Sequence, residues 1–294
     1  FIAIPGAVQH GASFAESAAK SGAVAILADT TGSEIAPTIP ALIVKDVRSA
    51  AGLASAWLYD EPMRSLDAVG VTGTNGKTTV TYLVHQLLMK AGRESGLIGT
   101  IESRIGLERI ESSRTTPEAA DLQALSAVMR ERHIRHLVME VSSHSIALKR
   151  IKGSFFKVLA FTNLTQDHLD FHSSMDDYFA AKTKLFSMTS AAVINTEDAH
   201  GAKLVSLLPA GVSVVTLGET GALKATNIAA SAHGTTHFEF EADGQSLSVE
   251  LPMIGDFNVM NALCAIAACS QVGVLFATAS TALATFPGVP GRCE

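Results

Sequence analysis

The feature of this sequence that most constrains its fold is an apolar stretch that leads into a glycine-rich turn and then into a helical pattern. Residues 68–72 are mostly apolar, residues 73–79 read G-T-N-G-K-T-T, and residues 79–90 carry apolar side chains at helical spacing. In such a strand–turn–helix unit, the backbone N–H groups of the turn and the helix dipole favour bound phosphate. The pattern therefore predicts a loop that binds the phosphates of a nucleotide.

Within this loop, Lys77 is expected to reach the β- and γ-phosphates, and the hydroxyl of Thr78 is expected to ligate Mg²⁺. Val71 stands where the strict G-x-x-x-x-G-K-[ST] pattern has its first glycine, so only the second half of that pattern is matched. The alternative is a plain glycine-rich turn with a solvent-facing lysine. The apolar strand before the turn and the helix after it favour the phosphate loop.

The alternation of apolar runs and helix-length segments continues along the chain. Further apolar runs bounded by turn residues lie at residues 136–141, 158–162, 191–195 and 212–217. Buried strands that alternate with helices predict an α/β fold with a doubly wound, mostly parallel sheet. Near the end, residues 236–241 and 246–251 alternate around Asp243-Gly244, which predicts a hairpin, and residues 258–269 are expected to form a helix.

Two domains are expected from the length of 294 residues, because domains commonly have ~100–200 residues. Glu61-Pro62 separates an initial α/β pattern from the apolar run that precedes the glycine-rich turn. We therefore expect a partial N-terminal α/β domain over residues 1–66 and a P-loop ATPase domain over residues 67–294. The first residues look like a strand already under way and the last do not resemble a domain end, so a fragment of a longer protein is expected.

Composition narrows the classes of partner. Lys and Arg number 22 against 28 Asp and Glu, and the resulting net charge of −6 gives no electrostatic footprint for nucleic acid or for an anionic membrane. No uncharged apolar run reaches the ~18 residues that a membrane span needs. Cys264, Cys269 and Cys293 form no C-x-x-C pair, which favours a reduced, cytoplasmic protein over a disulfide-bonded or zinc-binding one.

Two polar segments follow apolar runs and are expected at the carboxyl edge of the sheet, where open α/β sheets bind ligands. Glu140 ends one run, so its carboxylate is a candidate Mg²⁺ ligand, although a solvated loop carboxylate is the simpler interpretation. Residues 161–172 read F-T-N-L-T-Q-D-H-L-D-F-H. Their two His and two Asp suggest metal or proton chemistry as readily as a capped, solvated turn.

Two other residues receive a structural interpretation from pattern alone. Lys182 shares a helical face with Phe179 and Phe186, and a lysine on an apolar face usually extends its amine to solvent. Asn258 is expected to be the N-cap of the helix over residues 258–269, with contact to an adenine edge as the alternative.

Together these segments resemble the Mur ligase family of ATP-dependent amino-acid ligases. The T-T-P-E-A and M-E-V-S-S-H stretches look most like the members that add a diamino acid to a muramoyl dipeptide. The matching stretches occur in family order and are G-T-N-G-K-T-T at 73–79, T-T-P-E-A at 115–119, M-E-V-S-S-H at 139–144, F-T-N-L-T-Q-D-H-L-D-F-H at 161–172, A-A-K at 180–182, G-x-F-N-x-x-N at 255–261 and G-V-P-G-R-x-E at 288–294.

The resemblance implies which residues bind the substrates. Asn258 aligns with a position near the adenine, and Arg292 with an arginine near the γ-phosphate. Leu148 stands where Gln is common in the family. The family's ATP-phosphate positions are occupied by Gly73, Thr74, Asn75, Gly76, Lys77, Thr78 and Thr79. The positions that bind the UDP-linked muramoyl dipeptide are occupied by Thr115, Thr116, Ser142 and Arg150.

The resemblance also implies the metal chemistry. Thr78, Glu140 and His168 map to two Mg²⁺ sites. Lys182 aligns with a lysine that carries a CO₂-derived carbamate, whose oxygens suit a hard metal ion. The implied catalytic residues are Lys77, His168 and Lys182.

The implied reaction joins meso-diaminopimelate or L-lysine to UDP-N-acetylmuramoyl-L-alanyl-D-glutamate in peptidoglycan precursor synthesis. The terminal carboxylate takes the γ-phosphoryl group of ATP, and the amino group of the diamino acid then displaces phosphate. The expected partners are these small molecules, and no oligomeric state is predicted. In the family the amino-acid pocket lies in a C-terminal domain, expected after Glu294, so the choice of diamino acid is left open.

Three alternatives remain from the sequence. A folylpolyglutamate synthetase shares the ATP loop but should lack T-T-P-E-A and M-E-V-S-S-H as they stand here. A nucleotide-dependent switch predicts an N-K-x-D motif, which the sequence lacks. A metal hydrolase built on residues 167–172 would leave the loop at 73–79 unexplained.

Overall fold

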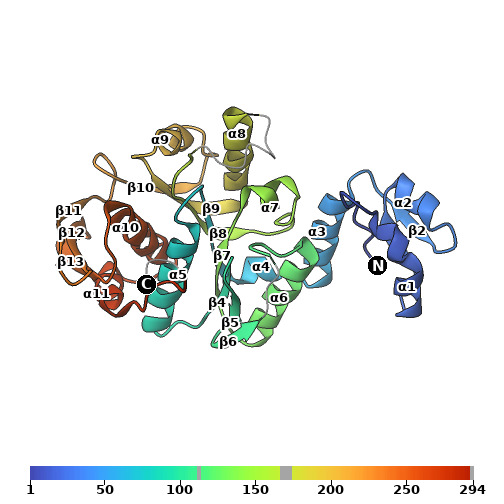
Figure 1. Cartoon of the computed structure of the whole chain (residues 1–294), viewed down its shortest axis with the longest axis horizontal. Helices are drawn as coiled ribbons and strands as arrows, with labels where there is room; N and C mark the ends of the chain where they lie inside the picture. The colour runs from blue at the N-terminus through green and yellow to red at the C-terminus, as the bar shows by residue number, and fades with distance from the viewer. Residues whose placement is uncertain (111–113, 166–173, 292–294) are drawn as a thin grey trace.

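A computed structural model of the chain describes residues 1–110, 114–165 and 174–291. Its central feature is an eight-stranded sheet with the strand order β10-β9-β8-β3-β7-β4-β5-β6 (Figure 1). The first six strands of this order pair in parallel, and the short strands β5 and β6 extend the β4 edge in antiparallel fashion. The predicted α/β fold with a mostly parallel sheet is confirmed. The bounds are β3 Asp67–Thr72, β4 Ser95–Ile98, β5 Ser103–Ile105, β6 Glu108–Ile110, β7 His136–Glu140, β8 Phe156–Phe161, β9 Thr189–Asn195 and β10 Ser213–Leu217.

Helices cover both faces of this sheet because alternate residues of its strands enter different cores. Val138 of β7 packs in the core that contains α5 and α10, whereas the next residue, Met139, packs in the core that contains α6 and α8. This double burial explains the near-continuous apolar runs in the sequence. The helices of the large unit are α5 Lys77–Lys90, α6 Ala119–Glu131, α7 Ser143–Ala147, α8 Met175–Leu185, η2 Phe186–Met188, α9 Ala199–Val205, α10 Asp256–Ser270, α11 Phe276–Ala282 and η3 Leu283–Thr285.

A three-stranded antiparallel sheet covers the outer side of α10 and α11 (Figure 1). Its strands are β11 Ala225–Ala230, β12 Thr236–Ala242 and β13 Gln245–Leu251. The predicted hairpin joins β12 to β13 through Asp243 and Gly244, which both have positive φ angles of 53° and 73°. Two consecutive residues of this kind suit the right-handed twist of a two-residue hairpin.

The N-terminal residues form a small unit with its own core and a two-stranded parallel sheet. Its elements are η1 Gly11–Phe14, α1 Ala15–Lys20, β1 Ile26–Ala28, α2 Thr30–Ile35 and β2 Ala41–Ile43. Helix α3, Val47–Leu58, leads from this unit to the large one and packs against α6, and the short α4, Pro62–Ser65, follows it (Figure 1). The division at residue 66 remains a prediction. No helix within the described ranges combines the length and apolar character needed to cross a bilayer.

Candidate active site

The glycine-rich loop lies between β3 and α5 at the carboxyl edge of the sheet. Gly73 and Gly76 have φ angles of 149° and 85°, a region that residues with a Cβ rarely adopt. A Cβ on Gly76 would lie 2.5 Å from Oδ1 of Asn261, and one on Gly73 would lie 2.0 Å from Oγ1 of Thr162. Both glycines are therefore required by backbone conformation and by close packing.

The polar residues that follow β8 hold this loop in place. The backbone N–H of Thr74 donates to the Asn163 carbonyl at 2.9 Å, and that of Asn75 donates to Asn163 Oδ1 at 2.9 Å. In return, the Thr162 hydroxyl donates to the Asn75 carbonyl at 2.6 Å and the Thr165 N–H donates to Oγ1 of Thr74 at 3.0 Å. The T-N-L-T stretch thus braces the loop, a role that the sequence did not reveal.

Lys77 begins α5, and its amine turns back onto the loop. It donates to the carbonyls of Gly73 and Thr74 at 3.0 and 2.8 Å. The alternative of a solvent-facing lysine is therefore wrong, because these carbonyls give the amine partners in the loop itself. Thr78 and Thr79 are both buried in the first turn of α5, whose N-cap residue, Gly76, provides no side-chain cap.

A cavity of about 490 Å³ opens beside the loop. Loop residues Asn75 and Gly76 form one wall, and Phe257, Met260 and Asn261 of α10 form another. Its apolar and amide groups suit a nucleotide base and ribose next to the phosphate loop. The remaining lining residues are Thr162, Asn163, Thr165, Asn195 and Cys264.

Asn258 is not the N-cap of α10, so that expectation is wrong. Gly255 with a φ of 101° is the N-cap, and α10 begins at Asp256. Asn258 is buried in the first turn, where its amide donates to the Ile254 carbonyl at 2.9 Å and accepts from Asn261 Nδ2 at 3.4 Å. Asn261 is the α10 residue that contacts the loop, and sequence analysis had given it no role.

Glu140 ends β7, the strand beside β3, and pairs with Val71 in the sheet register. Its side chain is buried, with a residue exposure of only 1%. Oε1 accepts from the Thr100 N–H at 2.8 Å and Oε2 accepts from the Thr100 hydroxyl at 3.1 Å. Within the described ranges no Lys, Arg or His forms an ion pair with it. The solvated-carboxylate interpretation is therefore wrong, and a buried carboxylate without a cationic partner fits a bound cation.

Lys182 of α8 is completely buried, at 0% exposure, so the expectation of a solvent-reaching amine is also wrong. Its Nζ donates to Thr72 Oγ1 at 3.0 Å and to the Gly73 carbonyl at 3.4 Å. The amine also lies 4.8 Å from the centre of the Tyr178 ring. Burial, and secondarily the charge of Lys77, hold the pKa of Lys182 well below its usual value. Although Lys182 lies on an apolar helix face, its amine does not extend to solvent, because Thr72 and Gly73 offer it hydrogen-bond acceptors inside the protein.

Three of the four residues expected to bind the UDP-linked substrate are linked to Glu140: Thr116 directly, Thr115 through Thr100 and Arg150 through Thr116. The Thr116 hydroxyl donates to the Glu140 carbonyl at 3.0 Å, and Oγ1 of Thr115 lies 3.2 Å from Oγ1 of Thr100. Arg150 donates from Nη1 to the Thr116 carbonyl at 3.4 Å. Ser142 begins α7, and its hydroxyl accepts from the Ser145 N–H as a helix N-cap.

Glu118 connects this region to the N-terminal unit. Its Oε1 lies 3.0 Å from Nε of Arg150, and its Oε2 lies 3.3 Å from Nη1 of Arg48 on α3. Arg48 in turn donates from Nη2 to the carbonyl of Pro5 at 3.3 Å. Arg150, which is expected to hold the substrate, is thus oriented by Glu118, which also pairs with Arg48 of α3. In the sequence, only the T-T-P-E-A motif pointed to Glu118.

His168 and Arg292 lie outside the described residues, as do all the His and Asp residues of the 161–172 motif. Within the described ranges, no group of three or more His, Cys, Asp or Glu is arranged to hold a metal ion. Of the residues expected to hold metal, the described ones are Thr78, Glu140 and Lys182, which all lie at the carboxyl edge of the sheet.

Comparison with known proteins agrees with this arrangement. The family model described as the Mur ligase middle domain matches residues 71–269. A UDP-N-acetylmuramoyl-L-alanyl-D-glutamate–2,6-diaminopimelate ligase of Corynebacterium glutamicum is 45% identical over 307 residues, with 100% of this chain and 59% of that protein aligned. The ligase of the same name from Streptomyces avermitilis is 43% identical over 302 residues, with the same coverage of 100% and 59%.

A solved structure of a ligase with this name superposes with a TM-score of 0.83 at 27% identity, over 96% of this chain and 58% of that one. The chain spans about 59% of the length of the curated relatives that it matches. The match to the family model covers most of the chain, and the full-length alignments exceed 40% identity. The chain belongs to the Mur ligase family.

Proposed function

We propose that this chain is part of an ATP-dependent ligase that adds diaminopimelate to UDP-N-acetylmuramoyl-L-alanyl-D-glutamate in peptidoglycan precursor synthesis. Its relatives of 40% identity and above carry that activity in their names. Diaminopimelate replaces the open choice between two diamino acids because those names specify it.

The observation that carries the proposal is the meeting of three groups at one edge of the sheet. The glycine-rich loop follows β3, Glu140 ends the adjacent strand β7, and the amine of Lys182 reaches the root of the loop. A nucleotide-dependent switch also uses a carboxylate to hold Mg²⁺, but it has no evident use for a second lysine buried at the root of its glycine-rich loop. A phosphoryl-transfer ligase uses both to hold and neutralise charge.

The residues present fit the Mg²⁺ and the carbamate that the family implies. Glu140 is a buried carboxylate without a cationic partner in the described ranges, which is the environment in which a metal ion compensates the charge. Lys182 has a lowered pKa, so its amine is readily neutral, and CO₂ reacts only with a neutral amine. The carbamate would convert a buried cation into an oxygen ligand close to Thr72 and Gly73.

Each part of the chain has a distinct task in the proposed reaction. The loop N–H groups and Lys77 bind the phosphates of ATP, and Lys77 exchanges its two loop carbonyls for phosphate oxygens. Mg²⁺, when bound, neutralises the charge of the transferring phosphoryl group. Arg150, Thr115 and Thr116 position the UDP-linked dipeptide so that its terminal carboxylate faces the γ-phosphate. The amine of diaminopimelate then displaces phosphate from the activated carbonyl carbon and an amide forms.

The test is release of phosphate from ATP by the whole protein in the presence of each substrate alone and in combination. We expect turnover only when UDP-N-acetylmuramoyl-L-alanyl-D-glutamate and meso-diaminopimelate are both present, with a new UDP-linked tripeptide detected by mass spectrometry. L-lysine, added in place of meso-diaminopimelate, serves as the control amino acid. Turnover with a folate and glutamate, or with ATP and water alone, would refute the proposal.

A further inference from the structure

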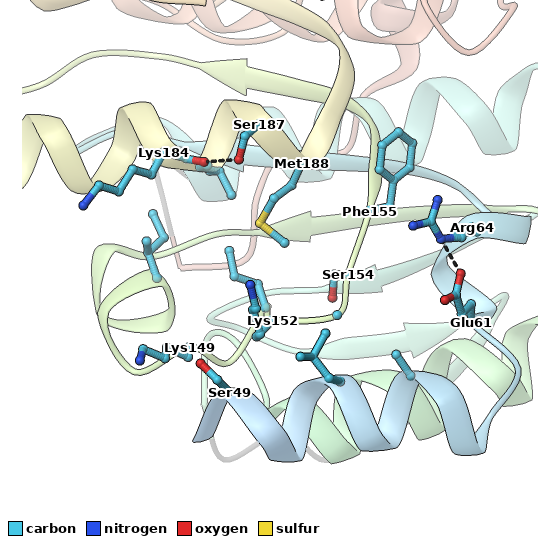
Figure 2. Close-up of a pocket in the computed structure, with 16 residues that line it drawn as sticks. Ser49, Glu61, Arg64, Lys149, Lys152, Ser154, Phe155, Lys184, Ser187 and Met188 are labelled. Carbon is cyan, nitrogen blue, oxygen red and sulfur yellow. Dashed lines mark hydrogen bonds and ion pairs between the residues drawn. The ribbon is translucent and has the colours of Figure 1, made fainter. Parts of the chain in front are cut away.

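A second cavity, of about 790 Å³, lies outside the site described above and shares no residue with the nucleotide cavity. Helix α3, the segment over residues 146–155 and the end of α8 with η2 surround it (Figure 2). The wall between α3 and the 146–155 segment is very close: a Cβ on Gly52 would lie 2.2 Å from the Lys152 carbonyl. This wall is part of the packed fold and is not a gap between loosely placed units.

The floor of the cavity is apolar and buried. Ile151 and Leu185 are both inaccessible, and Phe155 and Met188 add an aromatic ring and a flexible thioether (Figure 2). Leu53, which is 53% exposed on α3, contributes a further apolar side chain at the margin. A ligand seated here would gain by removing from water the accessible parts of Leu53, Phe155 and Met188.

The rim of the cavity is positively charged in a chain whose net charge is −6. Four cationic side chains line it, Arg64, Lys149, Lys152 and Lys184, against a single carboxylate, Glu61. Figure 2 shows Lys149 and Lys184 on one side of the view, Arg64 with Phe155 on the other, and Lys152 between them. The local charge is therefore opposite in sign to that of the protein.

Two of these four cations are neutralised by neighbours. Arg64 forms an ion pair with Glu61 and its guanidinium lies over the ring of Phe155, while Lys149 pairs with Asp46. In the part of the chain that the structure describes, the amines of Lys152 and Lys184 have no hydrogen-bond or ion-pair partner. Two uncompensated ammonium groups above an apolar floor form a surface complementary to an amphipathic anion.

We propose that this cavity binds a small organic anion that has an apolar body. The anionic group, a phosphate or a carboxylate, lies between Lys152 and Lys184, and the apolar body covers Leu53, Phe155 and Met188. Both Lys residues can approach such a group without breaking an existing ion pair. A neutral apolar compound would leave the charged rim unpaired, and an inorganic anion would leave the three apolar side chains in water.

The cavity is placed so that occupancy affects the binding of the UDP-linked substrate, a consequence that rests on the proposed function. Lys149 and Ile151, which line it, flank Arg150 in the chain. On the other wall, α3 carries Ser49 next to Arg48, and both arginines meet on Glu118. A ligand in the cavity contacts both α3 and the 146–155 segment and therefore acts on both ends of this ion-pair network.

Binding is tested by calorimetry on the whole protein without ATP or UDP substrate, using octyl phosphate, octanoate, octyl glucoside and inorganic phosphate, each below its micellar concentration. We expect octyl phosphate or octanoate to bind at least about tenfold more tightly than octyl glucoside or inorganic phosphate, and the better of the two identifies the preferred anion. Equal affinity for octyl phosphate and octyl glucoside would overturn the proposal.

The variants Lys152→Glu and Lys184→Glu, combined, should weaken binding of the anion by about tenfold or more, because two attractive contacts become repulsive. Lys157→Glu is the matched control, since Lys157 is exposed on β8 and does not line the cavity. Unchanged affinity in the double variant, with an unaltered melting temperature, would also overturn it. Neither binding measurement requires ligase activity, so both can be interpreted even if the proposed function is wrong.

The effect on the substrate is measured as the KM for the UDP-linked dipeptide with and without octyl phosphate. We expect octyl phosphate to change the KM by about threefold or more and to change kcat little. In the Lys152→Glu/Lys184→Glu variant, octyl phosphate should no longer change the KM. A KM that does not respond at saturating octyl phosphate would refute the link to Arg150, while the binding result would still stand on its own.

Discussion

The amine of Lys182 donates a hydrogen bond to the hydroxyl of Thr72, 3.0 Å away, although 110 residues separate them in the chain. Thr72 ends β3 and precedes the glycine-rich loop, so this bond joins α8 to the root of that loop. It also places a titratable amine where no solvent reaches. The chemical state of Lys182 is thereby connected to the geometry of the loop.

Replacing Lys182 by Met should raise the stability of the protein at neutral pH. The pKa of Lys182 is lowered in the folded state, so the unfolded chain binds more protons between this lowered value and about 10.4, and folding stability rises with pH through that window. The variant lacks this dependence. Its advantage in the free energy of unfolding, measured by urea titration in CO₂-free buffer, should shrink as pH rises, at no more than about 1.4 kcal/mol per pH unit. A constant advantage across pH would contradict the prediction.

Lys182→Ala should lose most ligase activity, and Lys182→Arg should lose it as well, because a guanidinium stays protonated and cannot form a carbamate. Acetate or another short carboxylate should partly restore Lys182→Ala by supplying the missing oxygens. Lys184→Ala, two residues further along α8, is the control and should keep its turnover. Full activity in Lys182→Arg would exclude the carbamate.

Lys77→Ala should reduce ATP-dependent turnover by about 10²–10³-fold, in line with the loss of one strong donor to a transferring charge. The melting temperature should change little, since the amine bonds to two carbonyls of its own loop. Lys90→Ala tests the same substitution at the exposed end of the same helix. Turnover equal to that of the wild type in Lys77→Ala would falsify the assignment of the loop.

Glu140→Gln should increase the Mg²⁺ concentration required for half-maximal turnover, because the amide keeps the volume and loses the charge. Thr100 can still donate to the amide oxygen, so the fold should persist. Turnover is measured across a Mg²⁺ titration, with Glu131→Gln at the exposed end of α6 as the control. An unchanged Mg²⁺ requirement would show that Glu140 is not a ligand.

Gly76→Ala should abolish nucleotide binding through a clash as well as through strain. Its Cβ would lie 2.5 Å from Asn261 Oδ1, whereas a Cβ on Gly92 at the other end of α5 meets nothing within 4 Å. Both glycines have positive φ angles, so both Ala variants should lose about 1–3 kcal/mol of stability. Only Gly76→Ala should also lose affinity for a fluorescent ATP analogue. Equal loss in the two variants would mean that strain alone explains the effect.

Residues adjacent in the chain were the ones whose placement could be predicted. The loop from Gly73 to Thr79 is a contiguous motif between a strand and a helix, and the mostly parallel sheet was predicted from the alternation of apolar runs and helices. Glu140 could be assigned to the correct edge of the sheet by the same argument. The burial of Glu140 could not be predicted, because it depends on hydrogen bonds from Thr100, which lies in another loop.

Contacts between distant segments explain what could not be predicted. The buried position of Lys182 depends on its hydrogen bond to Thr72. Asn261 packs against the loop only because Gly76 has no Cβ atom. The N-cap of α10 was misplaced because the positive φ of Gly255 lets the helix begin earlier than Asn258. Strands β5 and β6 were not predicted because each has only three residues and carries charged side chains at an edge.

The bracing of the glycine-rich loop has a consequence for how the protein is made. Asn75 obtains its hydrogen-bond partner from Asn163, 88 residues later, and Gly76 is packed by Asn261, later still. During synthesis, β3 and α5 leave the ribosome long before either brace exists, and non-local contacts of this kind form late. We therefore expect ATP to protect nascent chains from protease only after α10 has emerged, so that nucleotide cannot rescue an early misfolded intermediate.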